Sequence, residues 1–140
     1  MAFNGKLLEL KVGANYVEFP LKYIKAESYE ITPNQRMESS AARSASGVLK
    51  RTTCTHTASK IEFNTAPLTN ADVNDIYTKL SNAFTDSLQR KLDIRYYDPE
   101  SDSYKTATVY VPDAQLHILR IDIANNIIHY NSIRYAFIEY

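Results

Sequence analysis

The chain has 140 residues with 16 basic and 16 acidic side chains, so it has no net charge that would attract nucleic acid or an anionic membrane. This length fits a single domain over residues 1–140 that buries a core without metal or disulfide support. The single cysteine, Cys54, has no partner for an internal disulfide, as is typical of proteins that fold in a reducing cytoplasm. With no signal-peptide pattern and no run of about 20 apolar residues, the protein is expected to be soluble and not bound to a membrane.

The first predicted elements are short strands. Lys6–Val12 alternates apolar and polar side chains, and a Gly-Ala-Asn turn leads into a second strand over Tyr16–Leu21. Pro20 cannot donate to a β-ladder, so the second strand is expected at a sheet edge or bent by a bulge. Strand character continues through Tyr23 and Ile24 to Ile31.

A polar segment then separates two strands. Thr32–Gly47 is rich in small and turn-forming residues, and loops of this length are usually functional or disordered. Val48–Thr65 resumes as one long strand, or as two strands that break near Ala58 and Ser59. Because the first part of this strand is polar on both faces, we expect Lys25–Thr57 to form an extended hairpin that leaves the body of the domain.

Two interpretations of the hairpin tip stay open. It is either a flexible loop or an arm that orders against a neighbouring subunit. In the second case Arg36, Met37 and Arg43 supply the contacts, because arginine binds in a bidentate manner and methionine adapts to irregular surfaces.

Thr69–Lys91 is the only segment with a sustained helical period. Thr69 is a candidate N-cap with Asp72 three residues later, and Arg90 and Lys91 complement the helix dipole at the other end. The predicted buried stripe consists of Val73, Ile76, Tyr77, Leu80, Ala83, Phe84 and Leu88. One helix among strands is expected to cover one face or an open end of a sheet.

The remaining segments predict further strands. Leu92–Tyr97 and Tyr104–Val111 form a hairpin around a polar turn, and Leu116–Ile123 pairs with a last strand over Ile127–Tyr140. The predicted fold is therefore mainly β (α+β): an antiparallel β-sandwich or partly open barrel with one flanking α-helix and a long projecting β-hairpin. The 11 tyrosines suit inter-subunit surfaces, although tyrosine is also a favoured strand residue.

The sequence contains no recognisable catalytic or metal-binding motif. Cys54 and His56 share a strand face, and His117 and His129 fall on strands expected to pair, but spacings such as C-x-x-C or H-E-x-x-H are absent. We therefore expect no catalytic residues and no metal ligands. A small hydrolase or nuclease accessory built around these residues is an alternative.

Two binding patterns are also incomplete. Asp98, Glu100 and Asp102 alternate as in a calcium loop, but the required glycine and distal glutamate are missing, which favours a solvated turn. The glycines at positions 5, 13 and 47 cannot build a phosphate-binding loop, so no cofactor is expected. The basic residues Arg36, Arg43, Lys50 and Arg51 lack aromatic stacking partners, so no specific nucleic-acid binding is expected.

Several segments of the chain are distinctive as sequences: R-S-A-S-G-V-L-K-R at 43–51, K-I-E-F-N-T at 60–65, R-Y-Y-D-P-E-S-D-S-Y at 95–104, V-Y-V-P-D at 109–113 and the closing I-E-Y. Together they resemble a family of small tail-associated proteins of bacteriophages and prophages. The resemblance covers nearly the whole chain. It implies a gene near those of the tape-measure and distal-tail proteins, and a product that assembles in the host cytoplasm and is found in the virion tail.

The predicted order of elements also resembles the tail-tube fold of phages and contractile injection systems. That likeness implies a homo-oligomeric ring of six subunits, with residues 25–57 as the arm that reaches a neighbour and 69–91 as a helix outside the ring wall. Carried over by position, Arg36, Met37, Arg43 and Leu49 are the arm contacts. The chain is short for a main tube subunit, so a minor ring joining the tube to the distal tail or tip is expected. A tail-tip or receptor-facing binding module is the alternative.

Overall fold

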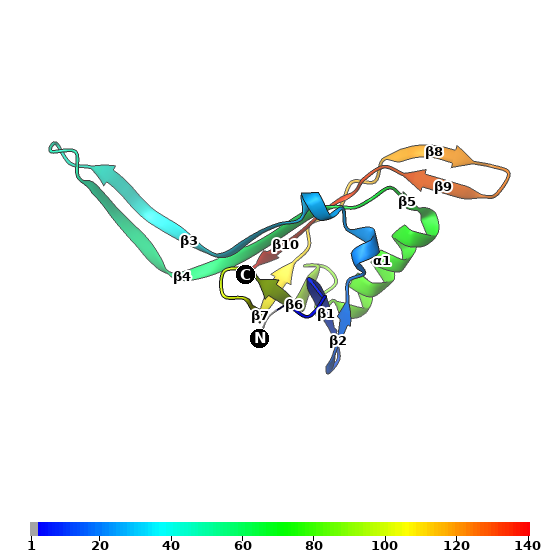
Figure 1. The fold of residues 1–140 in the computed structure, drawn as a ribbon, viewed down its shortest axis with the longest axis horizontal. Coiled ribbons are helices and arrows are strands. Elements are labelled where there is room, and N and C mark those ends of the chain that lie inside the picture. The colour runs from blue at the N-terminus through cyan, green and yellow to red at the C-terminus, as the bar shows by residue number, and fades with distance from the viewer. Residues whose placement is uncertain (1–2) are drawn as a thin grey trace.

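The protein is elongated, and a hairpin projects from each end of its central body (Figure 1). The computed structural model describes residues 3–140, without the side chains of residues 34, 37–40 and 52–56. Its strands are β1 (Leu8–Val12), β2 (Asn15–Glu18), β3 (Glu30–Arg43), β4 (Leu49–Asn64), β5 (Leu68–Thr69), β6 (Lys91–Asp98), β7 (Ser103–Tyr110), β8 (Ile118–Asp122), β9 (Ile127–Tyr130) and β10 (Arg134–Glu139). One α-helix, α1 (Asn70–Ala83), and two 3-10 turns, η1 (Leu21–Tyr23) and η2 (Ala26–Ser28), complete this mainly β fold.

Seven strands form the main sheet in the order β2-β1-β6-β7-β10-β4-β3, and all neighbours are antiparallel. The predicted β6–β7 hairpin is confirmed, with pairing from Lys91–Tyr110 to Asp98–Ser103. β7 and β10 are joined over a short stretch only, at Val109–Glu139 and Tyr110–Ile138. Over residues 3–140 the two end strands, β2 and β3, do not pair with each other, so the sheet does not close into a barrel.

The chain between β2 and β3 departs from the strand predictions. The second strand ends at Glu18 and not at Leu21, because Pro20 starts the 3-10 turn η1. The strand expected through Tyr23 and Ile24 to Ile31 begins only at Glu30. Before it, the η2 turn is held by Ser28, whose Oγ lies 2.6 Å from the carbonyl oxygen of Lys25.

A small second sheet has the order β5-β9-β8. β8 and β9 form the predicted hairpin, with Ile121 opposite Ile128. The single strand predicted over Ile127–Tyr140 is wrong, because the chain crosses between the two sheets after Tyr130. Thr65 holds the chain where it enters the main sheet: its Oγ1 accepts a hydrogen bond from Ile133 N at 3.0 Å, and its backbone N–H donates to Ile133 O at 2.9 Å.

The helix begins as predicted. Thr69 Oγ1 accepts a hydrogen bond from Asp72 N at 3.4 Å, and Asp72 Oδ2 accepts one from Thr69 N at 3.1 Å, which together make a capping box. Ile76, Leu80 and Ala83 of the predicted stripe are buried. The amphipathic period therefore placed these three residues correctly but not Tyr77 of the same stripe, which is 57% exposed.

Thr69→Ala is expected to cost about 1 kcal/mol of unfolding free energy, because it leaves helix N–H groups without their acceptor. Urea unfolding measures this loss. Thr78→Ala is the matched control, since Thr78 Oγ1 only donates back to Asn74 O at 2.8 Å on the exposed side of the same helix, and it should change stability by less than about 0.5 kcal/mol. Equal losses in both variants would contradict the capping role.

The helix ends at Ala83 and not at Lys91 as predicted. The Asp86 carboxylate accepts hydrogen bonds from the backbone N–H groups of Leu88 (3.1 Å) and Gln89 (3.2 Å), which stabilises a turn in place of further helix. As a result Leu88, predicted to lie on the buried stripe, is 96% exposed.

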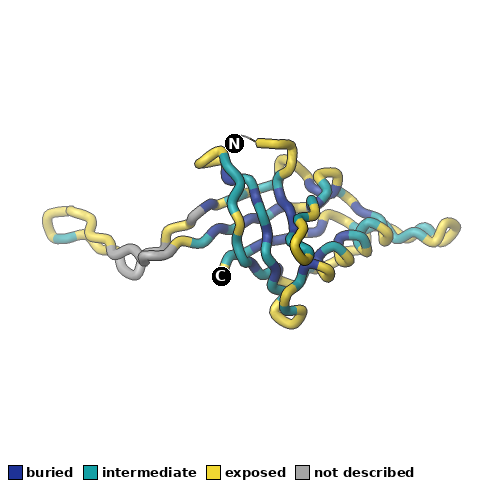
Figure 2. The backbone as a smooth tube through the Cα atoms, turned by 90° about the horizontal axis from the view of Figure 1, so that it is seen from below, coloured by how far each residue is buried: buried dark blue, intermediate teal, exposed yellow. Residues whose placement is uncertain are grey.

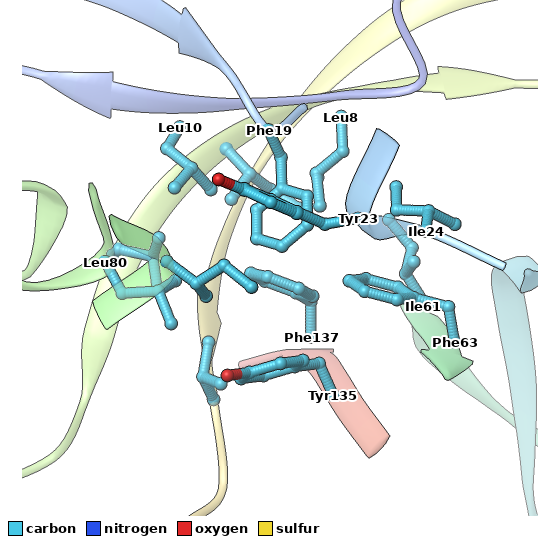
Figure 3. Close-up of a cluster of buried hydrophobic side chains, with 14 of the residues drawn as sticks. Leu8, Leu10, Phe19, Tyr23, Ile24, Ile61, Phe63, Leu80, Tyr135 and Phe137 are labelled. Atoms are coloured by element: carbon cyan, nitrogen blue, oxygen red, sulfur yellow. The ribbon is translucent and has the colours of Figure 1, made fainter. Parts of the chain in front are cut away.

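The core lies between the main sheet and α1, and aromatic rings occupy its centre (Figure 3). Phe63 of β4 makes an edge contact with Phe19 at 5.4 Å between ring centroids, and stacks on Tyr29 at 5.9 Å and on Phe137 at 6.1 Å. Some of the tyrosines belong to this core and not to the surface: Tyr23, Tyr96 and Tyr135 are buried.

The turn between β6 and β7 contains a buried carboxylate. Asp98 is fully buried and lies 2.8 Å from Lys105 Nζ, and it also accepts hydrogen bonds from Ser101 Oγ and from Glu100 N. Burial alone would raise the pKa of Asp98, but these donors outweigh it and hold the pKa below its ordinary value of 3.8. The solvated turn predicted at Asp98 is therefore wrong for this side chain.

Asp98→Asn is expected to destabilise the fold at neutral pH by roughly 1–3 kcal/mol, because it removes the charge that Lys105 and the turn donors bind. The pKa of Asp98 is lower in the folded than in the unfolded state, so its contribution is complete above about pH 4 and is lost as pH falls through the folded-state pKa. Chemical unfolding across this range should show the difference from wild type shrinking with decreasing pH. The exposed control Asp113→Asn should stay within about 0.5 kcal/mol of wild type. A pH-independent Asp98→Asn effect would contradict this.

Candidate assembly surfaces

The β3–β4 hairpin is an arm that extends beyond the body. From Gln35 to Arg43, β3 covers roughly 30 Å at about 3.4 Å per residue. Beyond the body the described side chains of this arm are mostly exposed, as Figure 2 shows. The arm is therefore held together mainly by its backbone ladder, and its surface is available to another molecule.

The long loop predicted over Thr32–Gly47 is wrong, because most of this segment is a strand of the arm. Strand β3 continues to Arg43, so only the segment from residue 44 to residue 48 remains as the tip. Of the two alternatives for Val48–Thr65, the single long strand is confirmed, because β4 runs unbroken from Leu49 to Asn64. The β3–β4 register shifts at three places, between Thr32 and Gln35, between Arg36 and Glu38 and between Glu38 and Ser40. The first shift lies beside Pro33, which cannot donate to the ladder.

The structure brings two of the four predicted contact residues together. Arg43 and Leu49 are cross-strand partners at the tip, where Arg43 Nη1 donates a hydrogen bond to Gly47 O at 3.0 Å. Arg36 lies closer to the body, opposite Thr57. The side chain of Met37 falls outside the described part of the chain.

The tip also contains a contact candidate that sequence analysis missed. Val48 is exposed beside Leu49, and Lys50 follows on the same strand. The tip thus offers two adjacent apolar side chains with basic neighbours. Two adjacent apolar residues, Val48 and Leu49, can be seen in the sequence. That they are exposed follows only from the projection of the arm beyond the body.

The root of the arm is fixed to the body by charged and polar contacts. Glu62 binds both Lys60 and Arg134, and these hydrogen bonds lower the pKa of Glu62. Asn64 N donates to Ser28 Oγ at 2.9 Å on the neighbouring turn. With Phe63 in the aromatic core, these contacts set the direction in which the arm leaves.

The β8–β9 hairpin projects from the opposite end of the molecule (Figure 1). The sequence pattern predicts this hairpin but does not show that its apolar side chains are exposed. Strand β8 and its flanks expose the large apolar side chains Leu116, Ile118, Leu119, Ile121 and Ile123. Such a concentration of exposed aliphatic residues is typical of an interaction site.

A pocket of about 390 Å³ lies between α1 and the segment that leads into β8. Its lining includes Val73, Tyr77, Ala114 and Leu116 as well as the Arg90–Asp113 ion pair. Tyr77, predicted to be buried on the helix stripe, is 57% exposed at this pocket. The pocket therefore offers apolar walls with a charged pair beside them.

The residues of the alternative catalytic hypothesis do not define a site. The side chains of Cys54 and His56 fall outside the described part of the chain. The strands β8 and β9 pair as predicted, and His129 is half-buried in β9, but the exposed His117 lies just before β8 and not on it. Among the side chains that the structure describes, no group of three or more His, Cys, Asp or Glu residues is placed to hold a metal ion. Within the same residues, no helix has the length and apolar character needed to span a membrane.

A family model described as a family of unknown function (DUF6711) matches residues 1–140. The chain belongs to the DUF6711 family. No curated protein and no solved structure matches it. This DUF6711 chain presents two candidate interaction surfaces, the projecting β3–β4 arm and the apolar β8–β9 hairpin.

Proposed function

We propose that this protein is a non-enzymatic structural component of a bacteriophage tail. In this proposal it forms a minor ring at the end of the tail tube and joins the tube to the distal tail or tip. The observation that carries the proposal is the β3–β4 arm, a hairpin with an exposed surface that extends well beyond the core. A long paired extension of this kind stabilises its own body little and suits contact with another subunit.

The open main sheet supports assembly as well. Its end strands, β2 and β3, have unpaired backbone groups on their outer sides over the described residues. Free strand edges invite unwanted pairing in a monomer, whereas a closed ring gives each edge a neighbour. In this proposal the arm contacts the next subunit through Arg43 and Leu49 beside its tip. Arg36 and Met37 would add contacts nearer the body.

The number of copies in the ring and the identity of its partner proteins are inferred from the resemblance to the tail-tube fold. In this proposal six copies form the ring, and its partners are the tail-tube, distal-tail and tape-measure proteins. The protein would be made and assembled in the host cytoplasm and reside in the virion tail. The helix α1 would lie on the outside of the ring wall.

A tail-tip or receptor-facing module is the second candidate. The pocket beside α1 favours it, because exposed Tyr77 and the apolar Val73 and Leu116 could bind a ligand. In that case the pocket, and not the arm, would carry the function.

A reconstruction of the phage particle that encodes the protein separates the two candidates. A closed ring of this chain between tube and tip, with each arm on a neighbour, is the expected result. A position at the outer surface with the pocket facing away from the tail would favour the receptor-facing module. A particle that lacks the protein would contradict both.

A further inference from the structure

Strand β8 has a free edge. Over the described residues it pairs with β9 alone, and Figure 1 shows no element beyond its outer side. Ile121, the last residue but one of the strand, is 60% exposed, and Ile123, just after the strand, is 83% exposed. An apolar strand edge in water is a ready site for strand addition.

The charges on this edge follow a self-complementary order. Residues 119–123 read Leu-Arg-Ile-Asp-Ile, with the cation and the anion on either side of Ile121. If two such strands pair antiparallel about Ile121, Arg120 of each copy lies opposite Asp122 of the other. In the same register Leu119 lies opposite Ile123, and Ile121 lies opposite itself. Opposite-charge and aliphatic cross-strand pairs both stabilise a sheet.

The state of both charges suits this pairing. Arg120 is exposed, and Asp122 is held in the hairpin turn by hydrogen bonds from Asn125, from its Nδ2 at 2.9 Å and from its backbone N–H at 3.3 Å. These bonds lower the pKa of Asp122, so the carboxylate is ionised at neutral pH. The edge strand β2, by contrast, contains Glu18 as its only charged residue. Two copies of β2 therefore cannot form pairs of opposite charge.

We propose that β8 pairs antiparallel with β8 of a second copy of this chain, across a two-fold axis at Ile121. The surface that each copy contributes contains Ile118, Leu119, Ile121 and Ile123. With Leu116 they present apolar area on the order of 500 Å², a substantial part of the ~800 Å² that one side of a standard interface buries. A two-fold contact of this kind closes with two copies. It is independent of the tail assignment and distinct from the head-to-tail contact of a ring.

Charge reversal tests the pairing. Arg120→Asp places two acids opposite each other at both cross-strand positions, and Asp122→Arg places two bases there. Each single variant should weaken self-association about tenfold or more in sedimentation equilibrium. The double variant Arg120→Asp/Asp122→Arg restores opposite charges and should restore the affinity. An equimolar mixture of the two single variants should form mixed dimers. Glu100→Lys is the control, since it changes net charge as Asp122→Arg does, at an exposed turn.

The register is tested by a disulfide. In a Cys54→Ser background, Ile121→Cys should cross-link two copies under mild oxidation, because residue 121 faces itself across the axis. Leu119→Cys should not, because its counterpart is residue 123 of the other copy. Efficient cross-linking at 121 but not at 119, together with restoration by the double charge swap, supports the proposal. Single charge reversals that associate like wild type, a double variant that stays dissociated, or equal cross-linking at both positions would overturn it.

Discussion

Replacing residues 37–56 with Asn-Gly is expected to leave the body folded and to abolish ring assembly. The replacement joins Arg36 to Thr57, which are cross-strand partners, through a two-residue turn that suits a β-hairpin. Because the described side chains of the removed segment are exposed, except for the half-buried Ser44, the unfolding free energy should change by less than about 1 kcal/mol. Native mass spectrometry and electron microscopy of the purified protein would then show rings for wild type only.

A point variant separates the tip contact from the length of the arm. Arg43→Glu reverses a charge at the tip beside Leu49 and should weaken assembly while the arm stays intact. Lys22→Glu makes the same change in net charge at the exposed η1 turn of the body and should assemble normally. Rings formed by the truncated protein would show that the arm is dispensable and would remove the basis of the proposed function.

Phe63→Ala is expected to destabilise the protein by about 3–5 kcal/mol. Phe63 is 1% exposed and contacts the rings of Phe19, Tyr29 and Phe137, so its loss leaves a cavity bounded by several elements. Phe63 also lies at the root of the arm, on the strand that carries it away from the body. A partly folded variant is therefore expected to lose the fixed direction of the arm as well. Thermal and urea unfolding measure the loss.

Leu88→Ala is the control for this large effect. It removes an aliphatic side chain of comparable size from a position that is 96% exposed, and should change stability by less than about 0.5 kcal/mol. A large loss of stability in Leu88→Ala would instead support a buried Leu88 and the longer helix that the sequence period predicts. A small effect at Phe63 would contradict the placement of the core around it.

The parts of the fold that sequence predicted well are those in which the side-chain pattern reflects burial. The alternation from Leu92 to Tyr96 matches a strand with one buried face, and Thr69 with Asp72 marks the start of the helix. The helix end was missed because Asp86 stabilises a turn through its own side chain, while the apolar spacing continues to Leu88.

The arm and the apolar hairpin were harder to predict for a physical reason. Between Gln35 and Arg43 a two-stranded ribbon pairs its backbone, and the side chains that the structure describes there are mostly exposed, so no alternation distinguishes the ribbon from a polar loop. For β8 the opposite holds. Its Ile and Leu residues predict a strand correctly, but a sequence pattern cannot tell whether such residues meet the core or, as here, extend beyond it. The charge order around Ile121 becomes meaningful only when the edge is known to be free.

The central claim is that the β3–β4 arm exists to contact another subunit. A reconstruction of the assembled protein, at a resolution that resolves side chains, tests it most directly. The account predicts that Arg43 and Leu49 of each copy lie against the body of the next copy. An assembly in which the arms extend into solvent, or a protein that stays monomeric with a ligand in the pocket beside Tyr77, would contradict it.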